Sequence, residues 1–327
     1  MIFDYLCPQI FPYKPQNINT KDFFSKDKPL IKNLCIYYPS SVIKKILFEN
    51  KTLWFKNMYK FNDSREMVFI NHKFQYVNDK LKKSKDIDKE LIDMYNEVFD
   101  DICFKYNNEA KIIKGNKEFK CYSRYYALCT SYRRDNYTCW SAFTSVVKDK
   151  NNECNNSNID DTRYGDCICF NKENLTMMIR ESLKGLHYGF VCYDKEEQYN
   201  IISSFLKNLQ KEYKELGIEK TRGYLNNYIE YCNVFFKDPF YDSEKEFRFV
   251  IDSHTYNLLN ETKLDFDKYE FKFDLSLISH ITISDETHLD SYHGKPEKFR
   301  VRRSKLILDE SKDVKYDGIL YEDYNTI

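Results

Sequence analysis

The order of apolar segments constrains the fold most strongly, because strand-like and helix-like segments follow one another without a regular rhythm. Runs of aromatic and β-branched residues predict strands, and apolar residues at a period of 3.6 predict helices. The predicted strands are 34–38, 52–55, 125–132, 166–170, 187–193, 244–251, 269–273, 278–284 and 299–308. The predicted helices are 40–50, 67–83, 88–106, 140–144, 196–216 and 221–236. Strands interrupted by helical pairs, without strand–helix–strand alternation, predict an α+β fold.

The length of 327 residues exceeds that of a typical single core, so one large elaborated domain or two smaller domains are expected. We expect one α+β domain, preceded by an irregular arm rich in Pro, Asn and Lys and followed by a tail. A segment rich in Asn and Asp inside this domain predicts a flexible loop. The expected boundaries are 1–33 for the arm, 34–310 for the domain, 64–106 for a helical insertion, 148–163 for the loop, 196–236 for a helical pair and 311–327 for the tail.

The charges balance, with 51 basic and 51 acidic residues, which argues against general attraction to nucleic acids or membranes. The densest basic segment, 298–305, alternates with apolar residues as edge strands do, and nucleic-acid contact there stays an open alternative. The eleven cysteines lack a Cys-x-x-Cys spacing, and no signal-like or membrane-spanning apolar segment is found. We therefore expect a soluble cytoplasmic protein with reduced thiols and no metal site.

Several common catalytic motifs are missing from the chain. It contains no phosphate-binding Gly-x-x-x-x-Gly-Lys-Ser/Thr loop, no Gly-x-Gly-x-x-Gly turn, no His-Glu-x-x-His pair and no Gly-x-Ser-x-Gly elbow. Only eight glycines are available for loops that hold phosphates closely. These absences disfavour nucleoside triphosphate hydrolysis, dinucleotide hydride transfer, zinc hydrolysis and the serine hydrolase triad. A cysteine nucleophile paired with a distant histidine stays open, but nothing selects one.

A Glu-x-Glu-x-Arg run leads into an apolar strand late in the chain. Alternate strand residues point to opposite faces, so Glu244, Glu246 and Arg248 are predicted to share one face, with Phe247 and Phe249 on the other. Three charged groups backed by an apolar face indicate a candidate site. The ordinary alternative is an exposed face of an antiparallel strand, with the arginine pairing a neighbouring carboxylate.

Three other segments combine polar and aromatic residues more than a core requires, namely 37–41, 60–66 and 127–143. Each has an ordinary alternative. Asn62 and Asp63 before a helix are a usual turn and capping signal, and Trp140 on a short helix is typical of a core residue.

The order of these motifs resembles the bacterial family DUF2971, a domain of unknown function, over roughly residues 34–285. The matching positions are Phe61-Asn62-Asp63-Ser64-Arg65-Glu66, Cys129-Thr130-Ser131, Asn136, Trp140-Ser141-Ala142-Phe143, Gly165 to Phe170, Val191-Cys192-Tyr193, Lys237 and Glu244 to Arg248. Two positions depart from the family pattern, since Ser64 replaces a proline and Phe143 replaces a tyrosine. The departure at Phe143 puts a role for that tyrosine hydroxyl in doubt.

The opening of this pattern also has a distant resemblance to ADP-ribosyltransferase-like folds, which implies a split β-sheet core with helical insertions and NAD as substrate. The resemblance places Tyr38 at the first-strand position, Ser131 or the segment 140–143 at the second, and Glu246, or with less support Glu244, as the catalytic carboxylate. The implied NAD-binding residues are Tyr38, Asn62, Asp63, Ser131, Trp140, Phe143 and Arg248. The implied partners are a protein or nucleic-acid acceptor and a regulatory partner, as for a toxin or antiviral defence effector, with no membrane.

The chemistry of this hypothesis is coherent. Cleavage of the nicotinamide–ribose bond develops an oxocarbenium-like charge, which a buried carboxylate can stabilise. Tyr38, Trp140 and Phe143 could hold the nicotinamide ring, and Arg248 could bind a phosphate or orient Glu246 by an ion pair.

Two other function classes stay open. One is a metal-dependent nuclease or phosphodiesterase that uses Asp63, Glu66, Glu244 and Glu246 around a divalent cation. The other is a non-catalytic module whose aromatic groove binds a nucleotide signal or a partner protein.

Overall fold

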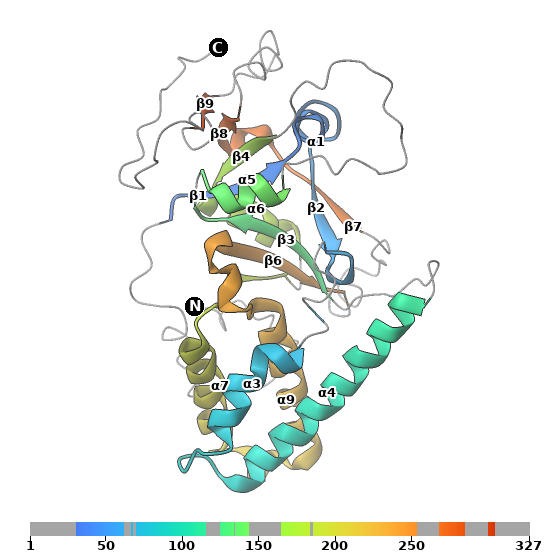
Figure 1. Ribbon diagram of the computed structural model, residues 1–327, viewed down its shortest axis with the longest axis vertical. Helices are drawn as coiled ribbons and strands as arrows, with labels where there is room; N and C mark the ends of the chain where they lie inside the picture. Colours follow the sequence, from blue (N-terminus) through green and yellow to red (C-terminus); the bar gives the residue numbers. More distant parts are fainter. Residues whose placement is uncertain are drawn as a thin grey trace.

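The computed structural model describes residues 31–61, 67, 70–115, 125–133, 135–143, 165–183, 186–253, 268–284 and 300–304. Within these ranges the chain is a mixed α+β structure, with strands at one end of the molecule and a group of long helices at the other (Figure 1). Most of the expected N-terminal arm, the loop 148–163 and the tail lie outside the described residues.

The described strands form one mixed sheet of nine strands, ordered β5-β6-β3-β1-β4-β8-β9, with β2 and β7 off this path. Every pairing is antiparallel except that of β8 with β9. The strands are β1 (Asn33–Tyr38), β2 (Thr52–Asn57), β3 (Tyr125–Ser131), β4 (Asp166–Asn171), β5 (Leu186–Phe190), β6 (Glu246–Asp252), β7 (Lys268–Lys272), β8 (Ile278–Ile283) and β9 (Val301–Arg303).

The sheet branches at β3. One edge of β3 pairs with β6 along its whole length, from Tyr125 to Ser131. The other edge is shared, because Tyr126 and Ala127 pair with β2 while Ser131 pairs with Cys35 of β1. The branch β2-β7 therefore leaves β3 separately from the branch β1-β4-β8-β9, and Figure 1 shows the two branches at a steep angle to each other.

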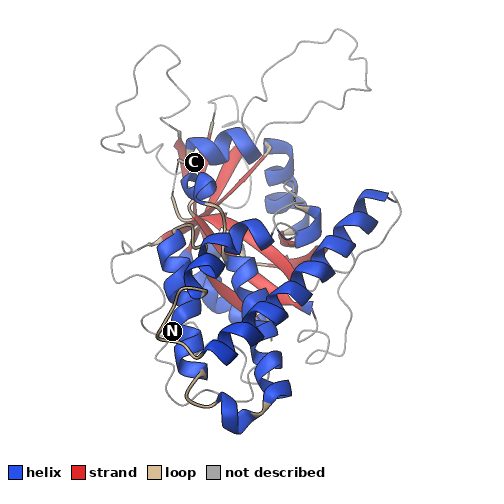
Figure 2. Ribbon diagram, turned by 60° about the horizontal axis from the view of Figure 1, so that its bottom comes forward, coloured by secondary structure: helices blue, strands red, loops and turns tan. Residues whose placement is uncertain are grey.

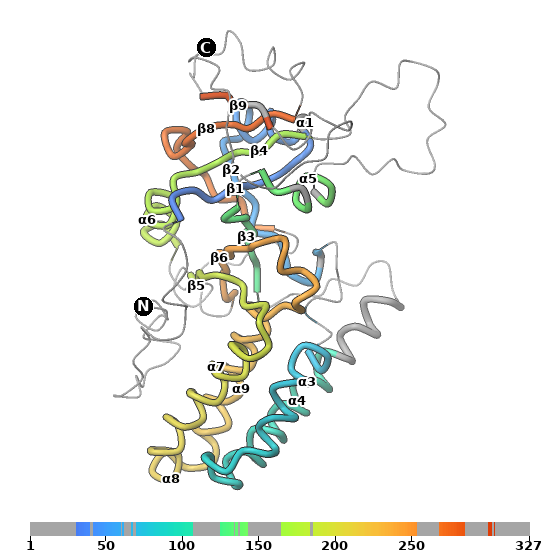
Figure 3. Tube along the Cα trace, turned by 60° about the vertical axis from the view of Figure 1, so that its left-hand side comes forward, coloured from blue at the N-terminus to red at the C-terminus, as the bar shows by residue number. Residues whose placement is uncertain are grey.

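The described helices are α1 (Ser40–Lys44), α3 (Ile70–Leu81), α4 (Lys89–Gly115), α5 (Tyr137–Phe143), α6 (Lys172–Ser182), α7 (Lys195–Leu209), α8 (Tyr213–Leu216) and α9 (Ile218–Phe235). A π-helical turn, Lys45–Asn50, continues α1. Helices α3, α4, α7 and α9 form a bundle beyond the strand β5, as the trace in Figure 3 shows. None of the described helices is long and apolar enough to cross a bilayer.

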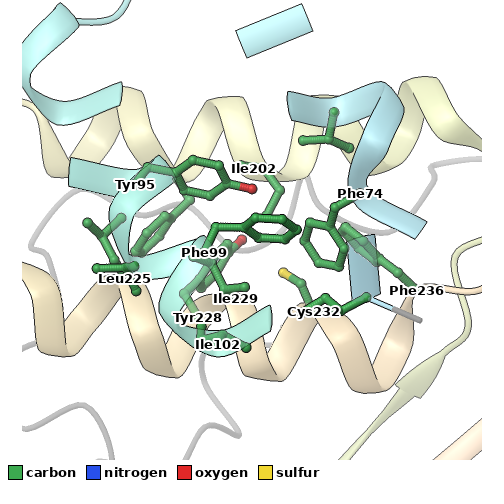
Figure 4. Packing of buried hydrophobic residues seen from close by; sticks show 14 of the residues in the cluster. Phe74, Tyr95, Phe99, Ile102, Ile202, Leu225, Tyr228, Ile229, Cys232 and Phe236 are labelled. Carbon is green, nitrogen blue, oxygen red and sulfur yellow. The ribbon is translucent and has the colours of Figure 1, made fainter. Parts of the chain in front are cut away.

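The bundle has its own aromatic core (Figure 4), and buried residues of the sheet belong to the same cluster. Its buried side chains include Phe74, Tyr95, Phe99, Tyr228 and Phe236, joined by apolar residues of β3 and β6. The rings of Phe205 and Tyr228 stack with centroids 3.7 Å apart. The apolar period of 3.6 residues that predicts helices over 67–83 and 88–106 is the period of the buried positions in α3 and α4.

The opposite face of the sheet is covered by α1, its π-helical turn and α6, so that the strands lie between helices (Figure 2). Ile43 of α1, Leu47 of the π-helical turn, and Leu175 and Ile179 of α6 belong to one buried apolar cluster with the phenylalanines of β6. The α+β class is confirmed, and the predicted helices and strands have counterparts among the described residues. Two of them differ in their bounds: the helix predicted over 196–216 ends at Leu209 and is followed by the separate α8, and the strand predicted from Glu244 begins at Glu246. Helix α6 was not predicted.

Candidate functional site

A cavity of about 290 Å³ opens where the two branches of the sheet diverge. Tyr38 of β1, Trp54 and Lys56 of β2, and Ser131 of β3 contribute to its walls. Another wall comes from Lys237, Tyr241 and Glu244, which precede β6, and from Glu246, the first residue of β6. The early tyrosine and the late acidic segment, about two hundred positions apart in the sequence, therefore meet at one cavity.

The acidic segment enters β6 through a tight turn. Glu244 ends a 3₁₀ turn, Pro239–Glu244, and Lys245 has a left-handed backbone with φ of 50° before the strand begins at Glu246. The hydroxyl of Ser131 donates to the carbonyl of Glu244 at 2.9 Å, which fastens the turn to the end of β3. The predicted strand thus starts two residues later than expected, and Glu244 reaches the cavity from the turn and not from the strand face.

Lys237 joins the two carboxylates. Its ammonium lies 2.5 Å from Glu244 Oε2 and 3.2 Å from Glu246 Oε1, and only 6% of the residue is exposed. The amide of Gln198 on α7 donates to the backbone carbonyl of Lys237 at 3.0 Å, so the helical bundle fixes this segment. Since the two glutamates are almost fully buried as well, the exposed-strand alternative for this acidic segment is wrong.

Arg248 contacts Glu246 from the next position on the same face of β6. Its Nε and Nη2 atoms lie 2.7 and 2.5 Å from Glu246 Oε2, and Nη1 donates to the carbonyl of Val234 at 2.6 Å. The residue is 0% exposed and does not line the cavity. Of the two roles expected for Arg248, the geometry supports orientation of Glu246 and not phosphate binding.

The two glutamates have opposite protonation behaviour. Burial, followed by the charge of Glu246, raises the pKa of Glu244 to about 7 despite the nearby Lys237. Burial also acts to raise the pKa of Glu246, but the charges of Arg248 and Lys237 outweigh it and lower that pKa to about 2. The surroundings therefore favour the protonated form of Glu244 and the ionised form of Glu246, and such a separation of two neighbouring pKa values is often found at catalytic sites.

Aromatic rings form the opposite wall. Tyr38 and Trp54 meet edge to face with centroids 6.4 Å apart, and burial raises the pKa of the Tyr38 hydroxyl, which stays neutral. Gly165 packs directly on this end of β1, because an added Cβ would lie 1.9 Å from the carbonyl oxygen of Tyr38. A residue with a Cβ therefore does not fit at position 165 without a shift of the backbone at Tyr38, which explains the glycine there.

The structure does not bring every predicted residue to the cavity. Trp140 is 0% exposed, donates from Nε1 to Asp135 at 2.8 Å and packs against Tyr37, so its ring is part of a core. Phe143 ends α5, and its side chain lies outside the described part of the chain. Asn62 and Asp63 also lie outside the described residues.

The sequence analysis used Lys237 and Asn136 only as motif positions and missed their structural roles. Asn136 donates from Nδ2 to the carbonyl of Ser243 at 2.6 Å and so supports the turn that carries Glu244. A lysine directly after two phenylalanines was the available signal, since a lysine in an apolar segment is buried only with a partner. Trp54 and Lys56 gave no comparable signal.

Comparison with known proteins supports the motif analysis for part of the chain. Residues 160–249 match the profile of a family described as protein of unknown function (DUF2971). The matched part contains Lys237, both glutamates and Arg248, so the resemblance to this family is confirmed there. No curated protein and no solved structure matches the chain.

Proposed function

We propose that the cavity binds NAD, cleaves its nicotinamide–ribose bond and transfers ADP-ribose to a macromolecular acceptor. The observation that carries this proposal is the adjacency of β1, β3 and β6, which places Tyr38, Ser131 and Glu246 around one cavity. These are the three positions that the resemblance to ADP-ribosyltransferase-like folds selects. Ser131 and Glu246 are directly paired in the sheet, and the branching at β3 provides the opening expected of a split-sheet core.

Glu246 has the properties that the bond cleavage requires. As nicotinamide leaves with the electron pair of the C1′–N bond, positive charge develops on the ribose. A buried carboxylate that is ionised and held by Arg248 can stabilise this charge without first rearranging. Glu246 is therefore assigned as the catalytic carboxylate.

Glu244 can serve the second half of the reaction. The acceptor nucleophile attacks C1′ and must lose a proton, and a carboxylate with a pKa of about 7 can accept it near neutral pH. Lys237 contacts both carboxylates and so holds them side by side. In this pair, Glu246 thus stabilises the positive charge and Glu244 accepts the proton.

The other walls suit the remaining parts of this substrate. Tyr38, Trp54 and Tyr241 offer rings for the nicotinamide, in place of the buried Trp140. Lys56 at the cavity offers a cation for a phosphate, in place of the buried Arg248. The volume of about 290 Å³ is near the lower limit of small-molecule sites and suits the nicotinamide riboside half of NAD.

The alternatives are less well supported. A metal-dependent nuclease would need its carboxylates available for a cation, but Lys237 contacts both glutamates and Arg248 contacts one of them. The alternative of a non-catalytic binding module does not explain why the pKa of Glu244 in the cavity is raised toward neutral pH. A toxin or antiviral defence effector is the biological role that fits consumption of NAD, and it is part of this proposal.

The test is nicotinamide release from NAD by the full chain, in parallel with the substitution Glu246→Gln. We expect the substitution to lower the rate by at least about a hundredfold, the effect of losing one preorganised electrostatic contact. The matched control is Glu270→Gln, an exposed carboxylate on β7, which should leave the rate unchanged. Circular dichroism verifies that each variant is folded. Equal rates in Glu246→Gln and the unsubstituted protein would refute the assignment.

A further inference from the structure

Three thiols gather on one face of the sheet, beside the cavity. Cys35 of β1 is directly paired with Cys169 of β4, and Cys167 lies two residues earlier on the same face of β4. The Sγ atoms of Cys35 and Cys169 are 3.0 Å apart, and those of Cys167 and Cys169 are 3.7 Å apart. All three Sγ atoms lie within 4.8 Å of one another, so a single ion could contact them all.

A histidine lies beside Cys169 on the neighbouring strand, outside the group of ligand atoms that are all within 4.8 Å of one another. His280 of β8 is directly paired with Cys169 and is 2% exposed. Its Nδ1 lies 3.0 Å from the hydroxyl of Ser279, while its Nε2 makes no hydrogen bond to any residue that the structure describes. A buried imidazole with one nitrogen held by a neighbour and the other available is the usual arrangement of a metal-binding histidine.

We propose that Cys35, Cys167 and Cys169 bind one zinc ion, and that a rotation of the His280 ring brings its Nε2 to the ion as the fourth ligand. Three sulfurs and one imidazole nitrogen are a common tetrahedral ligand set for structural zinc. Zinc–sulfur bonds of about 2.3 Å place tetrahedral sulfurs roughly 3.8 Å apart, which the Cys167–Cys169 pair already matches. Cys35 and Cys169 need to separate by less than about 1 Å, within the reach of small side-chain rotations. Binding releases the thiol protons to solvent.

Such an ion would connect strands that are far apart in the sequence. Cys35, Cys169 and His280 lie on three successive strands, β1, β4 and β8. Strand β1 also carries Tyr38, so the ion would stiffen the cavity wall that this strand forms. Because Cys35 contributes to the cavity lining, the cavity gives the ion a path to the site. This inference does not depend on the proposed use of NAD.

The experiment measures metal in the full chain purified under reducing conditions. We expect about one zinc per chain by mass spectrometry of the metal content. After zinc removal, cobalt(II) should produce thiolate-to-cobalt charge-transfer absorption and the strong visible bands of tetrahedral coordination. Protein without zinc that takes up no cobalt, or a Cys35–Cys169 disulfide in the purified chain, would overturn the proposal. These measurements need no variant, so a folding defect cannot obscure them.

Substitutions then identify the ligands. Cys169→Ser and Cys167→Ser should abolish stoichiometric zinc, and His280→Ala should weaken zinc affinity by at least about tenfold, the effect of losing even an outer-shell partner. The matched control is Cys103→Ser on α4, where a serine hydroxyl can still donate to Asn71 as the thiol does. Full zinc content in both Cys167→Ser and Cys169→Ser would exclude this ligand set.

Discussion

Replacement of Lys237 by methionine tests the charge arrangement of the cavity. The substitution keeps an unbranched side chain one atom shorter and removes the ammonium that lies 2.5 Å from Glu244 and 3.2 Å from Glu246. Arg248 still contacts Glu246, and Glu244 loses its cation. Removing one partner from a buried ion pair costs about 3–5 kcal/mol, a large part of the 5–15 kcal/mol by which a typical domain is stable.

The cost of Lys237→Met should depend on pH. Below pH 7 Glu244 takes up a proton, which removes the unpaired charge, so the loss of stability should be smaller at pH 5.5 than at pH 8. The assay is urea unfolding at both values, followed by the fluorescence of the two tryptophans.

The matched control is Lys207→Met, because Lys207 is 46% exposed and pairs with Asp86 at 3.3 Å. An exposed pair of this kind contributes less than about 1 kcal/mol at either pH. If Lys237→Met costs no more than Lys207→Met at pH 8, the buried charge cluster does not exist in solution as described.

Two further predictions concern stability. The folded-state pKa of Glu244 is raised from 4.5 to about 7, so its contribution to stability is full below pH 4.5 and is lost as the pH rises through 7. The loss should reach about 3 kcal/mol and be absent from Glu244→Gln in urea unfolding across this range; identical pH profiles would contradict it. Gly165→Ala should destabilise the protein by about 1–3 kcal/mol, because its Cβ would overlap the Tyr38 carbonyl. Gly223→Ala on α9, where a Cβ meets open space, should instead stabilise it by up to about 1 kcal/mol; the opposite order in thermal melting would refute the steric reasoning.

The regular elements were largely predictable, because local patterns determine them. Aromatic and apolar runs located β1, β3 and β4, and the period of 3.6 located α3 and α4. Helix α6 was missed although Asn171 caps it, since only Leu175 and Ile179 of its residues are buried and the apolar pattern is short.

The details of the site depend on contacts between distant segments, which local patterns do not contain. Glu244 and Glu246 have the spacing of strand neighbours, and nothing in the sequence signals the left-handed backbone of Lys245, a conformation more typical of glycine or asparagine. The backbone carbonyl of Lys237 accepts a hydrogen bond from Gln198 of α7, 39 residues earlier in the chain. The thiol cluster joins Cys35 to a strand 134 residues later, so its spacing shows no metal-binding rhythm.

The most direct test of the central claim is the binding of NAD to the pure full chain, measured by isothermal titration calorimetry. The proposed site predicts saturable binding with a Kd below about 1 mM, the upper end of typical enzyme substrate affinities. Tyr38→Ala should weaken this binding, because the ring lines the cavity, while Phe104→Ala on the exposed face of α4 should not. Absence of saturable binding, or equal binding by Tyr38→Ala and the unsubstituted protein, would contradict the assignment of this cavity to NAD.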